Sequence, residues 1–181
     1  MANFVALLRG VNVGKQNRVP MARFRDLLEK LGYTRVRTLL NSGNAVFSAP
    51  SRSADGIAKA IHGALGAKLG LDIAVVVKSA EDLAAVVKGN VLAKRGAVAS
   101  RLLVVFAQDE AALRALSPLA AAARAPERVA IGKAAAYAWC PDGVSKSVVG
   151  MALLGKSGRG VTTRNWATVL KLHELLGEME A

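Results

Sequence analysis

The chain has 181 residues, of which 52% are hydrophobic, so it can bury a substantial core as one domain or two small ones, and wholesale disorder is disfavoured. It contains a single cysteine, Cys140, which rules out an intramolecular disulfide and fits a reducing compartment. No apolar run reaches membrane-spanning length. We therefore expect a cytoplasmic protein that does not bind membranes.

The formal net charge of +12 is unevenly placed along the chain. Residues 1–40 contain eight basic and two acidic residues, and residues 143–172 contain five basic residues and no acid. A positive field of this kind favours phosphates, nucleic acid or acidic partners. It also serves simply to keep a surface soluble, and the sequence leaves both interpretations open.

The chain begins with an apolar run from Phe4 to Leu8, long enough for a buried strand, and continues into a polar loop that ends at Pro20. Proline is tolerated in the first turn of a helix, so a helix can start there. The spacing of apolar and turn residues then predicts a helix over 21–31, a strand over 34–40, a turn over 41–44, a strand over 45–47, a helix over 54–69 and a strand over 73–77.

A short helix over 80–88 and a connector over 89–100 follow, after which the pattern restarts. It predicts a strand over 102–107, a helix over 110–116, hairpin strands over 129–131 and 135–140, a helix over 148–153, a strand over 161–162 and a final amphipathic helix. Thr162 and Thr163 are the cap candidates for that last helix.

The order strand, helix, strand, strand, helix, strand is the βαββαβ pattern of ferredoxin-like units. We therefore predict an α+β protein with two tandem ferredoxin-like units, each an antiparallel sheet with helices on one face. The first unit spans residues 1–79, residues 80–100 form the short helix and connector, and residues 101–181 form the second unit with an appended C-terminal helix.

This topology brings distant polar segments together. In a βαββαβ unit the right-handed crossover makes the first two strands parallel, so the loop after strand one and the turn after strand two share one end of the sheet. Residues 9–18 should therefore lie beside residues 41–44, and residues 141–143 beside residues 163–165.

A strand that leads into a cationic, glycine-bearing loop before a helix is a plausible place to hold an anion. At the expected start of the last helix, a bound anion would offset an arginine that the helix dipole disfavours. The candidate ligand-binding residues are Arg9, Lys15, Arg18 and Arg164 for charge, and Asn12, Asn17, Ser42, Asn44 and Asn165 for oriented hydrogen bonds. The residues of 41–44 are equally typical of an ordinary hairpin turn.

Other motifs are weaker. Gly150 to Ser157 matches the phosphate-loop pattern G-x-x-x-x-G-K-[ST], but Met151 to Leu154 continues a helical stripe where that loop requires a different context. An RNA-recognition module stacks bases on strand aromatics, and here only Phe4 and Phe47 are available. Two histidines and one cysteine give no metal site, and no cofactor is expected.

Four segments together resemble the bacterial family called domain of unknown function 1697: LLRGVNVGKQNRVPM (7–21), RTLLNSGNAVF (37–47), PDGVSKS (141–147) and TTRNWATVLKL (162–172). The resemblance implies two ferredoxin-like units in tandem and carries no activity. The chain departs from the family pattern at Gly14-Lys15-Gln16, where the family tends to have Gly-Gly-Lys, at Asn90-Val91-Leu92, where it has Asn-Pro-Phe, and at Val148, where it has a basic residue.

The favoured interpretation is a cytoplasmic, non-catalytic binder of a phosphorylated or anionic ligand, which includes nucleic acid. One alternative is an enzyme that acts on a phosphate or acyl phosphate, because acylphosphatases are similar in fold and place an arginine-bearing loop after their first strand. The other is a structural or self-associating protein. The sequence does not identify a ligand or an oligomeric state.

Overall fold

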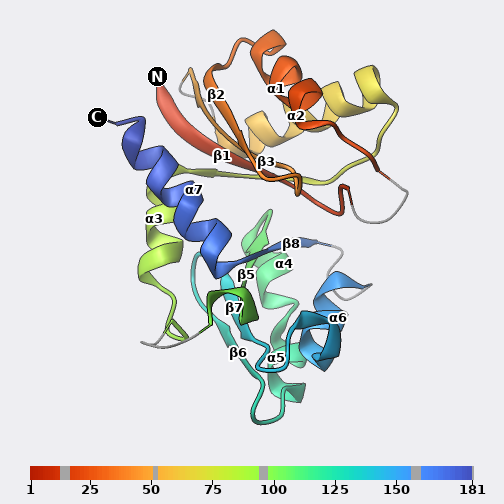
Figure 1. Cartoon of the computed structure of the whole chain (residues 1–181), viewed down its shortest axis with the longest axis vertical. Helices are drawn as coiled ribbons and strands as arrows, with labels where there is room; N and C mark the ends of the chain where they lie inside the picture. The colour runs from red at the N-terminus through yellow and green to blue at the C-terminus, as the bar shows by residue number, and fades with distance from the viewer. Residues whose placement is uncertain (13–16, 51–52, 94–97, 156–159, 181) are drawn as a thin grey trace. The chain divides into compact units, whose positions relative to one another are not determined.

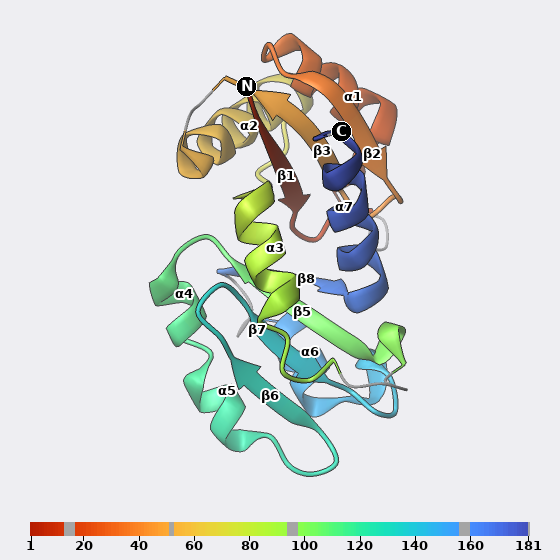
Figure 2. The same cartoon turned by 90° about the vertical axis from the view of Figure 1, so that its left-hand side faces the viewer.

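The computed structural model describes residues 1–12, 17–50, 53–93, 98–155 and 160–180 (Figures 1 and 2). The chain divides into two compact units. The first consists of Met1–Leu83 with Leu172–Ala181, and the second is Ala84–Lys171. Each unit has its own sheet, so each is described by itself below.

The first unit has the ferredoxin-like strand order β2-β3-β1-β4, in which every neighbouring pair is antiparallel. Helices α1 and α2 lie on one face of this sheet (Figure 1). The elements in chain order are β1 (Ala2–Leu8), α1 (Met21–Lys30), β2 (Thr34–Leu39), β3 (Asn44–Ala49), α2 (Ala54–Leu69) and β4 (Val75–Ser79).

The core of this unit forms because alternate residues of a strand point to the same face. Phe4, Ala6 and Leu8 of β1 are buried in one cluster with apolar residues of α1 and α2. The Phe47 and Tyr33 rings stack in this cluster with centroids 4.8 Å apart. Each large side chain that is fully buried here stabilises the fold by roughly 1.5–3 kcal/mol.

The second unit repeats the strand order as β6-β7-β5-β8, again antiparallel throughout (Figure 2). Apolar residues of α4 and α6 pack on one face of the sheet. The elements from the end of the first unit onwards are α3 (Ala80–Lys88), the 3₁₀ helix Ala99–Arg101, β5 (Leu102–Ala107), α4 (Glu110–Arg114), α5 (Ser117–Ala122), β6 (Arg128–Ile131), β7 (Ala136–Trp139), the 3₁₀ helix Val144–Lys146, α6 (Val148–Leu154), β8 (Val161–Asn165) and α7 (Trp166–Glu178). The predicted α+β fold of two tandem ferredoxin-like units is confirmed.

Two predicted element bounds are wrong for identifiable reasons. The fourth strand begins at Val75 and not at Ile73, because the Ile73 carbonyl accepts a hydrogen bond from Nδ1 of His62 (2.8 Å) while its side chain is buried in the core. The helix predicted over 110–116 ends at Arg114, and a second short helix with a proline in its first turn follows.

The cap predicted for the last helix is also wrong. Thr162 and Thr163 lie inside β8, where they pair with Phe106 and Val105. Oδ1 of Asn165 instead accepts a hydrogen bond from the backbone N–H of Thr168 (2.8 Å). Asparagine is a strong cap residue because its short side chain reaches the free N–H groups of the first turn.

Helices α3 and α7 each contribute to both units, whereas the sequence placed residues 80–100 outside both and all of the last helix in the second. The end of α7 is held within the first unit by two arginines of β2. Nη1 of Arg35 donates to the Met179 carbonyl (2.5 Å), and Nη1 of Arg37 lies 2.6 Å from Oε2 of Glu178. These long-range contacts leave no periodic signal in the sequence.

The fold makes a specific prediction for Gly43, whose φ of +76° belongs to the left-handed region. A Cβ here would lie 2.6 Å from Cβ of Leu8 and 2.6 Å from Cγ2 of Val11. We expect Gly43→Ala to lower the free energy of unfolding by about 1–3 kcal/mol through overpacking. Thermal denaturation measures the change.

The matched control is Gly63→Ala, in the interior of α2, where an added Cβ meets nothing within 4 Å. Alanine is the better helix former by up to about 1 kcal/mol, so this variant should melt at or above the wild-type temperature. A Gly43→Ala protein that melts with the wild type would contradict the close approach of the turn to Leu8.

Candidate functional site

The loop after β1 and the turn between β2 and β3 meet at one end of the first sheet, as the topology predicted. The backbone N–H of Leu8 donates to the Gly43 carbonyl (2.8 Å), and Leu7 pairs with Asn44. The second unit shows the equivalent arrangement: Leu102 pairs with Trp139 and Leu103 with Asn165. Residues 141–143 and Asn165 therefore share an end of the second sheet.

The Asn12 side chain joins the loop to the turn in the first unit. Its Nδ2 donates to the Val19 carbonyl (2.9 Å) and to the Asn41 carbonyl (2.6 Å), and its Oδ1 accepts from the Val19 N–H (2.9 Å). Asn12 has a φ of +56°, a conformation that asparagine tolerates better than most residues. Asn12 thus positions the loop, and its amide makes three internal hydrogen bonds.

Asn44 plays the corresponding part inside the turn. It is fully buried, and its Nδ2 donates to the Leu39 carbonyl and to Oγ of Ser42, both at 2.9 Å. Leu40, predicted as the last strand residue, has a φ of +57° and lies in the turn. Two of the asparagines predicted to bind a ligand, Asn12 and Asn44, therefore hold the loop and the turn in place.

Two cationic residues of the predicted site, Arg9 and Arg18, lie in the described parts of the loop after β1. Asn17 and Arg18 are exposed, Arg9 is half-buried, and the Arg9 backbone N–H donates to the Ala74 carbonyl (2.9 Å). Lys15 lies outside the described residues. Helix α1 begins at Met21, three residues after Arg18; its N-cap residue Pro20 makes no side-chain hydrogen bond, and its first turn contains no acidic residue.

The sequence predicted that Arg164 lies at the start of the last helix, but Arg164 lies within β8. It is 8% exposed, and its Nη1 donates to Oγ1 of Thr162 (2.9 Å) and to the Thr163 carbonyl (2.7 Å). Burial lowers the pKa of Arg164 to about 10, because desolvation disfavours the charged form. The described contacts of Arg164 thus include a local network within its own strand, and Asn165 serves as the α7 cap.

Side chains of the protein bind the free N–H groups at the start of α6, shortly after the turn 141–143. The start of α6 is capped by Oγ of Ser147, which accepts from the Gly150 N–H, and by Oε1 of Glu127, which accepts from the Val148 N–H. Burial raises the pKa of the Cys140 thiol, against the opposing effect of a hydrogen bond with Ser147. A buried thiol with a raised pKa is a poor nucleophile, so Cys140 is a core residue.

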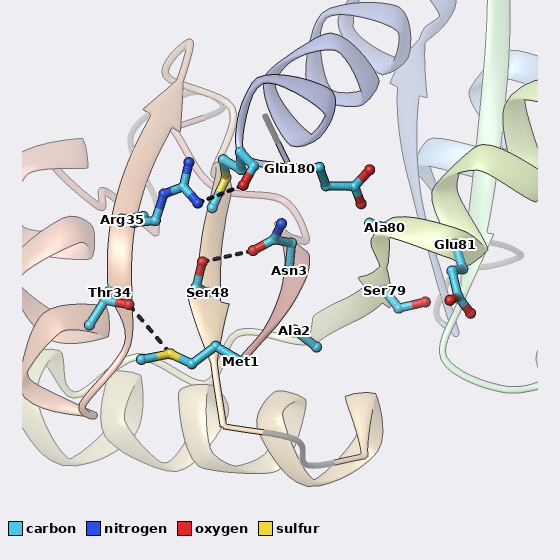
Figure 3. A pocket seen from close by; sticks show the side chains of 11 residues that line it. Met1, Ala2, Asn3, Thr34, Arg35, Ser48, Ser79, Ala80, Glu81 and Glu180 are labelled. Atoms are coloured by element: carbon cyan, nitrogen blue, oxygen red, sulfur yellow. Dashed lines mark hydrogen bonds between the residues drawn. The ribbon is translucent and has the colours of Figure 1, made fainter.

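A cavity that the sequence did not predict lies at the opposite end of the first sheet (Figure 3). It has a volume of about 690 Å³. Arg35, one of its lining residues, has a φ of +54° and lies where the register of β2 with β3 shifts. Left-handed backbone at a residue other than glycine or asparagine has no reliable sequence signal, so alternation alone could not reveal it.

The described part of the chain contains neither a candidate metal-binding cluster nor a candidate membrane-spanning helix. Across the residues that the structure places, no three His, Cys, Asp or Glu side chains gather in a way that could hold a metal ion. Among the helices of those same ranges, none is long and apolar enough to span a bilayer.

The model of the family described as Protein of unknown function (DUF1697) matches residues 1–137. The chain belongs to this family. The segments 141–147 and 162–172, which also resemble the family, lie beyond the matched residues. A solved structure, that of the conserved bacterial protein SP0830 from Streptococcus pneumoniae, has a TM-score of 0.80 and 24% identity, covering 97% of this chain and 98% of that one. It supports the fold, and no curated protein matches the chain.

The site geometry predicts that Asn12→Ala is strongly destabilising, because it removes three hydrogen bonds and leaves the buried Val19 N–H without its acceptor. Asn17→Ala is the matched control, since Asn17 has nearly the same φ, +51°. At roughly 0.5–1.5 kcal/mol for each net hydrogen bond, Asn12→Ala should cost about 2 kcal/mol more than the control. Chemical denaturation of both variants measures this difference, and equal losses would show that backbone strain alone is involved.

Proposed function

We propose that this protein is a non-catalytic binder of a phosphorylated or otherwise anionic ligand, nucleic acid included, and that it works in the cytoplasm. The binding site would be the loop 9–18 together with the turn 41–44. The observation that carries the proposal is the Asn12 clamp, which joins the beginning of the loop to Val19 at its end and to Asn41 of the turn. A site that is ordered in advance loses less entropy on binding.

The electrostatics of this end of the sheet support the same proposal. The first acidic residue of the chain is Asp26, whereas Arg9, Lys15 and Arg18 precede it. Helix α1 begins beside Arg18 without a carboxylate in its first turn or a side-chain cap. Backbone N–H groups at a helix start attract anions, and arginine can grip an oxyanion with two parallel hydrogen bonds.

Binding without catalysis is favoured over acyl-phosphate hydrolysis by the state of the asparagines. A hydrolase of that kind needs a side-chain amide that orients the attacking water. The amides of Asn12 and Asn44 instead donate to backbone carbonyls and to Ser42.

The high net charge of the second unit means that the binding experiment needs a control variant in that unit. Ala84–Lys171 contains 13 basic and four acidic residues, a net of +9, whereas the rest of the chain contains 12 basic and nine acidic residues, a net of +3. Diffuse attraction of a polyanion would therefore come mainly from the second unit. A specific site on the first unit must be distinguished from it by removing equal charge from each.

We expect the double variant Arg9→Gln, Arg18→Gln to weaken binding of inorganic pyrophosphate at least about tenfold, because charge-assisted hydrogen bonds contribute about 1.5–3 kcal/mol each. The control is the double variant Arg101→Gln, Arg128→Gln, which removes two exposed charges of the second unit. Calorimetric titration with pyrophosphate at low salt measures both.

The same proteins are then titrated with a mixed single-stranded oligonucleotide at about 50 and 200 mM salt, where counterion release makes polyanion affinity fall steeply. Absence of binding to either probe at low salt would overturn the proposed function. Equal losses in the two double variants would assign the binding to diffuse surface charge and not to the loop.

A further inference from the structure

The cavity of the first unit lies at the end of the sheet away from the loop 9–18. Strand β1 is antiparallel to β3 and β4, so its start meets their ends there. Asn3, Ser48 and Ser79 line the cavity from these three strands (Figure 3). Arg35 adds a guanidinium from β2, and Glu81 and Glu180 add carboxylates from the start of α3 and the residues after α7.

The carboxylates distinguish this cavity from the rest of a basic protein. Glu81 and Glu180 are exposed, and neither forms an ion pair with another residue that the structure describes. The start of α3 is already capped, since Oγ of Ser79 accepts from the Asp82 N–H (3.0 Å) and Oδ2 of Asp82 accepts from the Ser79 N–H (3.2 Å). Glu81 is therefore not needed as a cap and is available to a cation.

Hydrogen-bond donors on the other side of the cavity complement these acids. Oδ1 of Asn3 accepts from Oγ of Ser48 (2.7 Å), and among the described residues none accepts from its Nδ2. Arg35 uses Nη1 on the Met179 carbonyl, which fixes the direction of the side chain while its other N–H groups have no acceptor within the described ranges. The left-handed backbone of Arg35 holds this arrangement at the rim of the cavity.

The geometry points to a binding site for a small zwitterion, an amino acid or short peptide, in this cavity. Its ammonium group would bind Glu81 and Glu180, and its carboxylate would bind Arg35 and Asn3. The volume of about 690 Å³ lies in the range of roughly 300–1,000 Å³ typical of small-molecule sites. The cavity lies at the opposite end of the sheet from the loop 9–18 and is lined by two carboxylates, so this site is separate from the one proposed above.

The test is calorimetric titration of the full chain with the dipeptide Ala-Ala, with its N-acetyl derivative, which lacks the ammonium group, and with its C-terminal amide, which lacks the carboxylate. We expect Ala-Ala to bind and each blocked form to bind at least about tenfold more weakly. Equal affinity for the amide would show a site for simple cations and overturn the assignment of Arg35 and Asn3. No binding of Ala-Ala at millimolar concentration would overturn the site.

Substitutions of single residues test whether Ala-Ala binds in this cavity. Glu81→Gln should weaken Ala-Ala at least about tenfold, whereas Glu174→Gln, an exposed acid of α7 that does not line the cavity, should leave the affinity unchanged. Arg35→Lys should weaken Ala-Ala more than the C-terminal amide, and its melting temperature shows whether the Met179 contact survives. Competition by inorganic pyrophosphate at unchanged ionic strength would mean that both ligands use one site, and the zwitterion site would be wrong.

Discussion

Three hydrogen bonds of the Asn12 side-chain amide hold the loop after β1 and join it to the turn after β2 at one end of the first sheet. The Asn12 side chain ties the loop after β1 to the turn after β2 across 29 residues of sequence, and the Leu8 N–H adds a backbone hydrogen bond to the Gly43 carbonyl. Gly43 reinforces the arrangement, since only a residue without Cβ lets the turn lie against Leu8 and Val11. The Asn12 amide and Gly43 together hold residues 8–12 and Val19 against the turn 41–44.

The two ends of the first sheet differ in charge. The segment before α1 contains Arg9 and Arg18 and no acid, whereas the opposite end of the sheet opens into a cavity lined by Glu81 and Glu180, neither of which forms an ion pair with another described residue. Antiparallel pairing keeps the ends apart along the strands, so an anion and a cationic group can be attracted to one small unit at different places. One ferredoxin-like scaffold thus offers two chemically distinct surfaces.

Arg164 lies in a different element from the one that the sequence predicted. An arginine close to a helix start pointed to an anion, but β8 extends three residues beyond its expected end and takes Arg164 into the sheet. There it is buried, and hydrogen bonds to Thr162 and Thr163 offset part of the desolvation of its charge. Asn165, which the sequence predicted as a ligand-binding residue, caps α7 by accepting a hydrogen bond from the Thr168 N–H.

Local periodicity and topology were sufficient to predict the tandem fold and the meeting of residues 9–18 with residues 41–44, because both follow from short-range spacing and the handedness of strand crossovers. Three features required the tertiary structure: the left-handed backbone of Arg35, the capture of the α7 end by Arg35 and Arg37, and the cavity that results. Each depends on residues that are distant in the chain, and a one-residue register shift in β2 decides which side chains face the cavity. The sequence by itself determined the secondary-structure elements and their order. Packing between distant segments decided which polar side chains form hydrogen bonds within the protein and which remain exposed at the surface.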